Sequence, residues 1–466
     1  MGSGNPLASV TNPTPNLPWF FGTTARNVNS PTTISSATQT FNPSSPIMTS
    51  PNPLGVMSST TASIQVDDKI IYVATLWRHG ERYPEDFFPG DINESGNFSQ
   101  GEMTLNGMNE LFELGIQLRN RYVDFLKLVS PRYNPKEIYV RSTDLNRTLI
   151  SAQSVLAGFY SSGGIPGVDF PAISGWPTNF TPVPVHSDPQ DDDIILPFYS
   201  NCSRKNELWE MLKSSTYYNE ILNESSFYLE EINNQTGENF DLLGALGVMN
   251  NIILENALRL PIVPWANSLV GEFGRVFAEY MGSLLGFGEV ESNSTSKIDV
   301  QKELSILLSG AFLNFFTDKI VQKTNCEVSN FTDDYCGIMR NQKFFGFSGS
   351  DIALMALFKG LGFNETNGDE NKIPDFGSCI LMELWQKNDF DENSNNSMTG
   401  HYLRIYYMKD PLVGTLTDLG TVLGCPEGKC MMDFVSQKAE EIRPNPENSE
   451  LCDFGNPEFL KDKVSV

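Results

Sequence analysis

KIIYVATLWRHGERYP, residues 69–84, is the stretch of this sequence that decides its fold. Residues 69–77 are almost all apolar and several are β-branched, which predicts a strand buried on both faces of a parallel sheet. Arg78, His79 and Arg82 follow this strand directly. Loops at the carboxyl ends of parallel strands are where open α/β sheets hold their ligands. We therefore expect His79 to belong to a binding or catalytic site.

The residues around His79 suit one kind of chemistry. The chain has only three histidines among 466 residues, so this residue type is not scattered freely. Guanidinium groups at Arg78 and Arg82 would contact the oxygens of a phosphoryl group in pairs and stay charged at any working pH. A neutral imidazole nitrogen of His79 would then attack phosphorus. The alternative is that His79 is an ordinary polar residue in a basic loop.

A second strand–loop–helix unit follows the first. Helical spacing over residues 104–127, with Thr104 as a candidate N-cap, precedes a repeat of the pattern at residues 137–160. Arg141 lies at the end of the second predicted strand. Two successive units with arginine in the loop predict a shared anion site. Three arginines there would make a metal ion unnecessary, so we expect no metal and no cofactor.

The rest of the chain divides into three kinds of sequence. Residues 151–290 contain Pro-rich connections and amphipathic stretches, which predict a mostly helical insertion. Strand-like runs return at residues 342–349, 379–387 and 401–408, and the first leads into a helix. The prediction is an α/β fold with a mostly parallel sheet core flanked by helices. The core would span residues 64–150 and 291–466, residues 151–290 would form an inserted helical cap, and residues 1–63 would be a low-complexity, disordered leader.

The composition narrows the partners and the compartment. A formal net charge of −25 argues against nucleic acid or an anionic membrane as the main partner and is compatible with an acidic compartment. No apolar run is long enough to suggest a membrane span, and no signal peptide is visible at Met1. Asn-x-Ser/Thr sequons, more numerous than chance predicts, indicate the secretory pathway and N-glycans. They begin at Asn93, Asn97, Asn146, Asn179, Asn201, Asn223, Asn234, Asn293, Asn330, Asn364 and Asn395.

The cysteines give a second indication of an oxidising compartment. Cys425 and Cys430 are close in sequence, as are Cys326 and Cys336, and each pair would close a short disulfide loop. The alternative for Cys425 and Cys430 is a metal knuckle, but no second Cys/His pair completes a zinc site nearby. The total of seven cysteines leaves one over.

Several motifs in order along the chain resemble one family. RHGERYP resembles the RHGxRxP signature of the histidine acid phosphatases. Further similarities to that family lie at residues 139–152, 182–186, 196–202 and 347–357, within a span from about residue 69 to residue 452. The resemblance is stronger to the prostatic and lysosomal type of animal acid phosphatase than to phytases.

This resemblance implies a role for each matching residue. His79 corresponds to the nucleophile that forms phosphohistidine, and Arg78, Arg82 and Arg141 correspond to the phosphate-binding arginines. Asp351 corresponds to the acid that protonates the leaving alkoxide and then assists water. It could also be a plain helix N-cap, or serve in both ways.

The two other histidines and Ser350 complete the set of candidate residues. His186, in the PVPVH motif, would contact phosphate or order its loop, whereas His401 would be structural. Ser350 stands where the family usually has a second histidine, which donates to the phosphate. A serine hydroxyl is shorter and neutral, so we expect a phosphomonoesterase with weakened or altered activity. The alternative is a secreted phosphatase-fold binding protein with little or no turnover.

The resemblance also bears on disulfides, assembly and location. It implies the pairs Cys202–Cys452 and Cys425–Cys430, and a free, buried Cys379, because the usual partner position of Cys379 is occupied by Leu254. Cys326–Cys336 would be peculiar to this chain. Homodimers are common in the family, and the expected location is secreted or lysosomal. The substrate would be a small-molecule or protein phosphomonoester.

Overall fold

The computed structural model describes most of the chain after the predicted leader. It describes residues 68–444 except 97, 191–192, 194, 196–197, 199–201, 289–297, 328–333, 368–371 and 391–397. The predicted leader, residues 1–63, lies outside the described residues, as does Cys452.

The central sheet is mixed. Its order is β2 (Ile138–Ser142), β3 (Phe344–Gly349), β1 (Lys69–Arg78), β4 (Cys379–Gln386), β5 (His401–Met408) and β6 (Leu416–Asp418), and β7 (Cys430–Met431) pairs with β5. β1 and β2 run parallel to β3. β4 runs antiparallel to β1, and β5 runs antiparallel to β4, β6 and β7. The α/β class is confirmed, but the prediction of a mostly parallel sheet is wrong.

The reason for this error lies in β4 and β5. Nearly every residue of β4 and of β5 is buried. A central antiparallel strand that is covered on both faces has the same continuous apolar run as a strand of a parallel sheet. Strand direction is therefore not readable from the run itself. It depends on the connections, and these bring β4 beside β1 and β5 beside β4 in the antiparallel sense.

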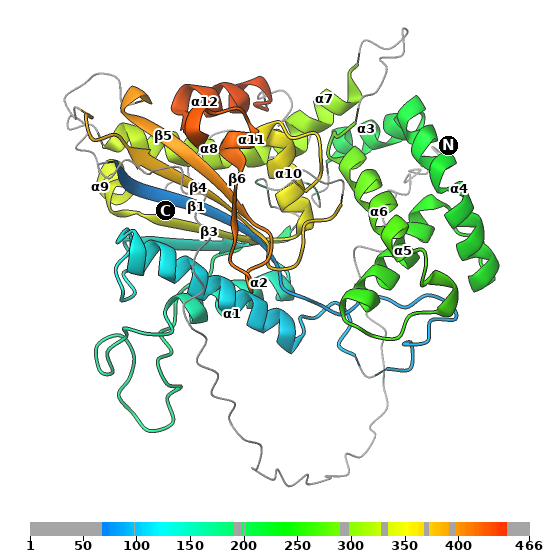
Figure 1. The fold of residues 1–466 in the computed structure, drawn as a ribbon, viewed down its shortest axis with the longest axis horizontal. Coiled ribbons are helices and arrows are strands. Elements are labelled where there is room, and N and C mark those ends of the chain that lie inside the picture. Colours follow the sequence, from blue (N-terminus) through cyan, green and yellow to red (C-terminus); the bar gives the residue numbers. More distant parts are fainter. Residues whose placement is uncertain are drawn as a thin grey trace, which may run out of the picture. The chain divides into compact units, whose positions relative to one another are not determined.

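Helices cover both faces of the sheet (Figure 1). α1 (Leu105–Arg119), which continues as the π-helical η1 (Asn120–Phe125), and α2 (Asn146–Phe159) lie on one face. α8 (Ala311–Cys326), α10 (Asp351–Leu361) and α12 (Met432–Glu441) lie on the other. The predicted N-cap is confirmed, since the Thr104 side chain accepts from the Gly107 N–H.

α1 and α2 approach each other closely because glycines face each other across the contact. A Cβ at Gly115 would lie 2.1 Å from the Val155 carbonyl oxygen, and one at Gly158 would lie 2.0 Å from that of Phe112. Any larger residue would push α2 away from α1. The contact therefore holds the carboxyl-terminal half of α2 against α1.

A second group of helices follows α2. α3 (Ser203–Lys213), α4 (Thr216–Thr236), α5 (Leu242–Ala257) and α6 (Val270–Leu284) pack on one another. The predicted cap, residues 151–290, contains all four, but its first residues belong to α2. The cap as a domain of its own stays a prediction.

One helical run is longer and more apolar than we expected from the sequence. α7 (Val300–Leu304), the π-helical η4 (Ser305–Gly310) and α8 together form a helix with the length and composition of a membrane span. In its most apolar window, 72% of the helix is buried inside the protein, so it is a core helix. Short elements complete the described chain: η3 (Pro264–Ala266), α9 (Asp334–Asn341), η5 (Met398–Gly400), α11 (Leu419–Val422) and η6 (Pro426–Gly428).

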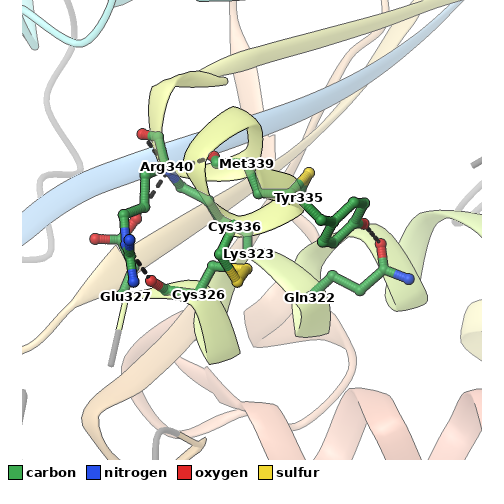
Figure 2. Close-up of a disulfide and its surroundings, with 8 residues drawn as sticks. All are labelled: Gln322, Lys323, Cys326, Glu327, Tyr335, Cys336, Met339 and Arg340. Atoms are coloured by element: carbon green, nitrogen blue, oxygen red, sulfur yellow. Dashed lines mark hydrogen bonds and ion pairs between the residues drawn. A yellow bond between two sulfur atoms is a disulfide. The ribbon is translucent and has the colours of Figure 1, made fainter. Parts of the chain in front are cut away.

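The predicted disulfide Cys326–Cys336 is confirmed and joins the end of α8 to α9 (Figure 2). Beside it, the ammonium group of Lys323 donates to the carbonyl oxygens of Met339 and Arg340, each at 2.9 Å. Lys323 is 1% exposed, so a buried cation stabilises the last carbonyls of α9. The disulfide and the lysine together hold α9 on α8.

The other cysteines agree with the predictions as far as they are described. Cys425–Cys430 is a disulfide, which excludes the metal knuckle. Cys379 is free and buried at the start of β4. Cys202 is disulfide-bonded, and its expected partner Cys452 lies outside the described residues.

Candidate active site

The carboxyl ends of three parallel strands meet at one edge of the sheet. β1 ends at Arg78, which is in register with Gly349 of β3. On the other side of β3, Arg141 of β2 is in register with Phe347. Side chains two residues apart along a strand point to the same face. Arg78 and Arg141 therefore flank β3 on the same face of the sheet, as a shared anion site requires.

The loop after β1 is held by its backbone and by α2. The His79 N–H donates to the Gly349 carbonyl oxygen at 2.9 Å, and the Gly80 N–H donates to Ser151 Oγ at 3.2 Å. A Cβ at Gly80 would lie 2.2 Å from the Gly107 carbonyl oxygen. Only glycine fits there, which explains the glycine after His79.

The hydrogen bond of the His79 ring leaves Nε2 as the unprotonated nitrogen. His79 is 2% exposed, and Nδ1 lies 2.9 Å from the Gly80 carbonyl oxygen. A carbonyl oxygen only accepts hydrogen bonds, so in this contact Nδ1 carries the proton. In the neutral ring, Nε2 then keeps a free lone pair. This is the nitrogen that a nucleophilic histidine needs.

The surroundings keep His79 neutral. Burial lowers the pKa of His79 well below its usual value, and the nearby charges of Arg78, Arg147 and Arg82 lower it further. The bond to the Gly80 carbonyl opposes this shift. Burial and the arginine charges therefore favour the neutral imidazole over the imidazolium.

The three predicted phosphate-binding arginines are buried, and each has a carboxylate partner. Arg78 Nη2 lies 2.8 Å from Asp351 Oδ2. The Arg78 guanidinium also stacks on the Phe376 ring at 4.2 Å. Arg82 Nη2 lies 3.6 Å from Glu85 Oε1. Among the residues that the structure describes, Nε of Arg78, of Arg82 and of Arg141 is buried without a hydrogen-bond partner.

Arg141 is held from the side of the segment before α3. Its Nη2 lies 2.8 Å from Asp188 Oδ2 and 3.4 Å from Asp193 Oδ1. These aspartates were missed from the sequence, because an acidic run in a Pro-rich segment resembles an ordinary solvated loop. They fix the guanidinium while its Nε–H stays available.

Asp351 and Ser350 lie at the start of α10. Ser350 takes the N-cap position without a side-chain cap bond, so Asp351 is the first helical residue rather than the N-cap. Asp351 Oδ1 accepts from the Ile352 N–H at 2.9 Å, and its Oδ2 faces Arg78. The Ser350 Oγ is buried and has no hydrogen-bond partner within the described part of the chain.

The two other histidines differ in their surroundings. His186 pairs through its backbone with β2, and its ring stacks on Tyr139 with 4.5 Å between centroids. The ring is exposed and borders a cavity of about 510 Å³ beside β2, and no contact of its imidazole with the arginines is found. Contact of His186 with phosphate stays a prediction. His401 opens β5 and is fully buried, as a structural residue would be.

Arg147 is a fourth arginine in this cluster, and the sequence analysis missed it. It is the second residue of α2, and its Nη2 lies 3.1 Å from Glu85 Oε1. Its signal in the sequence was an arginine six positions after Arg141, at the start of a predicted helix. Among the described residues no group of three or more His, Cys, Asp and Glu side chains lies together as metal ligands would.

Comparison with known proteins gives the class of protein. The family described as "Histidine phosphatase superfamily (branch 2)" matches residues 69–408, well over half of the chain. The chain belongs to this superfamily, and the predicted resemblance to the histidine acid phosphatases is confirmed. It is therefore a phosphatase, an enzyme that acts on phosphomonoesters.

Particular relatives agree with this assignment. The chain is 30% identical over 407 residues to "Putative acid phosphatase F26C11.1" of Caenorhabditis elegans, covering 84% of this chain and 89% of the relative. It is 29% identical to lysosomal acid phosphatase of Bos taurus, covering 78% and 76%. Among solved structures, the apo form of Hafnia alvei phytase superposes with a TM-score of 0.55 at 14% identity, covering 82% and 98%. That last likeness concerns the fold alone.

Proposed function

We propose that this chain is an acid phosphatase that hydrolyses phosphomonoesters through a phosphohistidine at His79, with activity weakened or altered by Ser350. The observation that carries the proposal is a neutral, buried imidazole surrounded by arginines whose Nε–H groups are buried and unpartnered. Buried donors without partners are rare in folded proteins, and a phosphate oxygen is the acceptor that guanidinium groups prefer.

The first step transfers the phosphoryl group. The lone pair of His79 Nε2 forms a bond to phosphorus while the bond from phosphorus to the ester oxygen breaks. Asp351 gives its proton to that oxygen, so an alcohol leaves. Arg78, Arg82 and Arg141 stabilise the charge on the three remaining oxygens.

The second step releases phosphate. Water attacks phosphorus, the bond to Nε2 breaks, and Asp351 takes back a proton from the water. The 2.8 Å contact with Arg78 Nη2 places Asp351 beside one of the arginines that would hold the phosphoryl group.

Ser350 sets the expected level of activity. Its hydroxyl is neutral, 3% exposed and without a hydrogen-bond partner among the described residues. A cationic donor at this position would stabilise the transition state, and removal of one such donor costs roughly ten- to a thousandfold in rate. The same observation favours the second candidate, a secreted phosphatase-fold protein that binds phosphomonoesters with little or no turnover.

The location proposed is the lysosome or the outside of the cell. Relatives named lysosomal acid phosphatase and two disulfides support it. N-glycans fit the sequons at Asn179, Asn223, Asn234 and Asn364, which are exposed. Asn93 is an exception, because it is 7% exposed and its Nδ2 donates to the Pro261 carbonyl oxygen at 2.9 Å. A homodimer is part of the proposal on family grounds only.

A phosphomonoesterase assay from pH 4 to 7 tests the proposal. Wild type, His79→Ala and Ser350→His are compared on an aryl phosphate. We expect activity that His79→Ala abolishes and that Ser350→His raises by about tenfold or more. An inert wild type whose activity appears with Ser350→His would establish the binding protein instead. Activity that His79→Ala leaves unchanged would exclude the mechanism.

A further inference from the structure

Arg147 is linked to the loop that carries His79 by hydrogen bonds through Ser151. Ser151 Oγ accepts from the Gly80 N–H at 3.2 Å and donates to the Arg147 carbonyl oxygen at 2.6 Å. The amino-terminal turn of α2 is thus tied to the loop that carries His79. Near the other end of α2, Gly158 packs on Gly115 of α1 and holds the two helices together.

The charge of Arg147 acts on the nucleophile. It lowers the pKa of His79, and its effect exceeds that of Arg82. It is also the strongest charged neighbour of Arg82, whose pKa falls to about 10 through burial and this repulsion. Arg147 therefore acts on His79 in the same sense as the predicted phosphate-binding arginines Arg78 and Arg82.

The hydrogen bonds of Arg147 are incomplete. Its Nη2 lies 3.1 Å from Glu85 Oε1, and the same oxygen lies 3.6 Å from Arg82 Nη2. One carboxylate oxygen thus serves two guanidinium groups, and it neutralises only one of their two charges. The Nε of Arg147 is buried without a partner among the described residues, like those of the three predicted arginines.

We propose that Arg147 is a fourth phosphate-binding arginine, which donates to the substrate phosphate, and that Glu85 is the counter-ion that Arg147 and Arg82 share in the absence of substrate. This inference rests on the proposed function, because it assigns one more ligand to the same phosphate. Glu85 competes with the phosphate for both guanidinium groups, so the pair sets the affinity of the pocket.

The alternative is that Arg147 and Glu85 are a structural ion pair. The two interpretations predict opposite effects of Glu85→Gln on phosphate binding. If the pair is structural, Arg147→Ala and Glu85→Gln both remove it and change the pocket in the same direction. If Arg147 is a phosphate ligand, Arg147→Ala weakens phosphate binding, and Glu85→Gln strengthens it because the competing anion is gone.

Titration calorimetry with inorganic phosphate at pH 5 on the full chain separates these outcomes without needing turnover. We expect Arg147→Ala to weaken phosphate binding about ten- to a hundredfold, Arg147→Lys to restore part of it, and Glu85→Gln to strengthen it severalfold. Arg132→Ala is the matched control, since Arg132 pairs with Asp169 at 2.8 Å outside the cluster and should leave binding unchanged.

A second readout is the pH profile of turnover. Loss of the Arg147 charge should raise the pKa of His79, so the acid limb of kcat/KM should move to higher pH in Arg147→Ala but not in Arg132→Ala. Equal weakening by Arg147→Ala and Glu85→Gln, or unchanged phosphate binding in Arg147→Ala, would overturn the assignment. Failure of the proposed function looks different: phosphate binding would respond as expected while no His79-dependent turnover is found.

Discussion

The arginines around His79 and the carboxyl pair of Glu255 and Asp91 are two buried clusters of like charge, and the repulsion within each is relieved in a different way. In the first, Arg78, Arg82 and Arg147 surround His79 and lower its pKa. In the second, Glu255 of α5 is fully buried beside Asp91. Burial raises the pKa of Glu255 to about 8, the Asn93 side chain opposes the shift, and the Asp91 charge adds to it. In both clusters burial and like charges favour the uncharged form of the titrating group, which lowers the pKa of the base His79 and raises the pKa of the acid Glu255.

The difference lies in what relieves the repulsion. In the arginine cluster the buried groups without a partner among the described residues are N–H donors, so an added dianion is favourable there. In the carboxyl pair they are acceptors, Oε1 and Oε2 of Glu255 and Oδ2 of Asp91, so an added proton is favourable. The carboxyl pair is relieved by a single proton held on Glu255 at acidic and neutral pH. Around this pair the loop after β1 is joined to the α5 region: Asn93 Nδ2 donates to the Pro261 carbonyl oxygen, and Asn251 Nδ2 donates to that of Asp86. The first cluster would therefore bind an anion, and the second would hold a proton.

The largest effect should come from removing a cation from the first cluster. Arg78→Ala removes a proposed phosphate donor, removes the ion-pair partner of Asp351 and reduces the positive charge that lowers the pKa of His79. We expect kcat/KM for an aryl phosphate at pH 5 to fall about a thousandfold. Steady-state kinetics measure it, with Arg132→Ala as the control. A loss below about tenfold would mean that the cluster does not stabilise the transition state.

An intermediate effect should come from the second cluster and should appear in stability. A Glu255 pKa of about 8 lies above the unfolded value of 4.5. Its contribution to stability is therefore fully present below pH 4.5 and is lost as pH rises towards 8. Glutamine keeps a donor at every pH, so the Tm of Glu255→Gln relative to wild type should rise by about 3–5 °C between pH 4.5 and pH 8.5.

Thermal unfolding followed by circular dichroism across this pH range checks the prediction. Glu230→Gln on α4 is the matched control, because Glu230 is exposed and its substitution should leave the slope unchanged. If the Tm difference between Glu255→Gln and wild type stays constant with pH, Glu255 does not hold the proton.

The smallest effect should come from a carboxyl that borders the first cluster. Glu110 Oε2 accepts from the Glu81 N–H at 2.9 Å. Burial raises the pKa of Glu110 to about 7, and the charge of Glu81 adds to this rise. The hydrogen bond from the Glu81 N–H and the charge of Arg78 oppose the rise. As pH rises through 7, a negative charge therefore appears near Arg78 and weakens its hold on an anion. In wild type, this charge should lower kcat/KM about twofold between pH 6 and pH 8, and Glu110→Gln should not show that loss. An identical pH dependence in wild type and variant would show that Glu110 is not felt at the site.

Much of the fold and part of the site were predictable because their causes are local. The apolar runs of β1, β3, β4 and β5 gave strands, and Thr104 gave the start of α1. Cys326–Cys336 and Cys425–Cys430 followed from short sequence separations. Arg78 and His79 were found because a strand end carries both the position and the residue types of an anion site.

The sequence by itself determined the strand–loop–helix units, the superfamily and the residues after β1, because each depends on neighbours along the chain. Only the tertiary structure decided the antiparallel half of the sheet, the place of Arg147 beside His79 and the burial of Asn93. Strand direction, like the distance between charges on different elements, depends on how distant segments pack. Apolar runs, single arginines and sequons look the same in a sequence wherever they are buried, and it is burial that changes their chemistry.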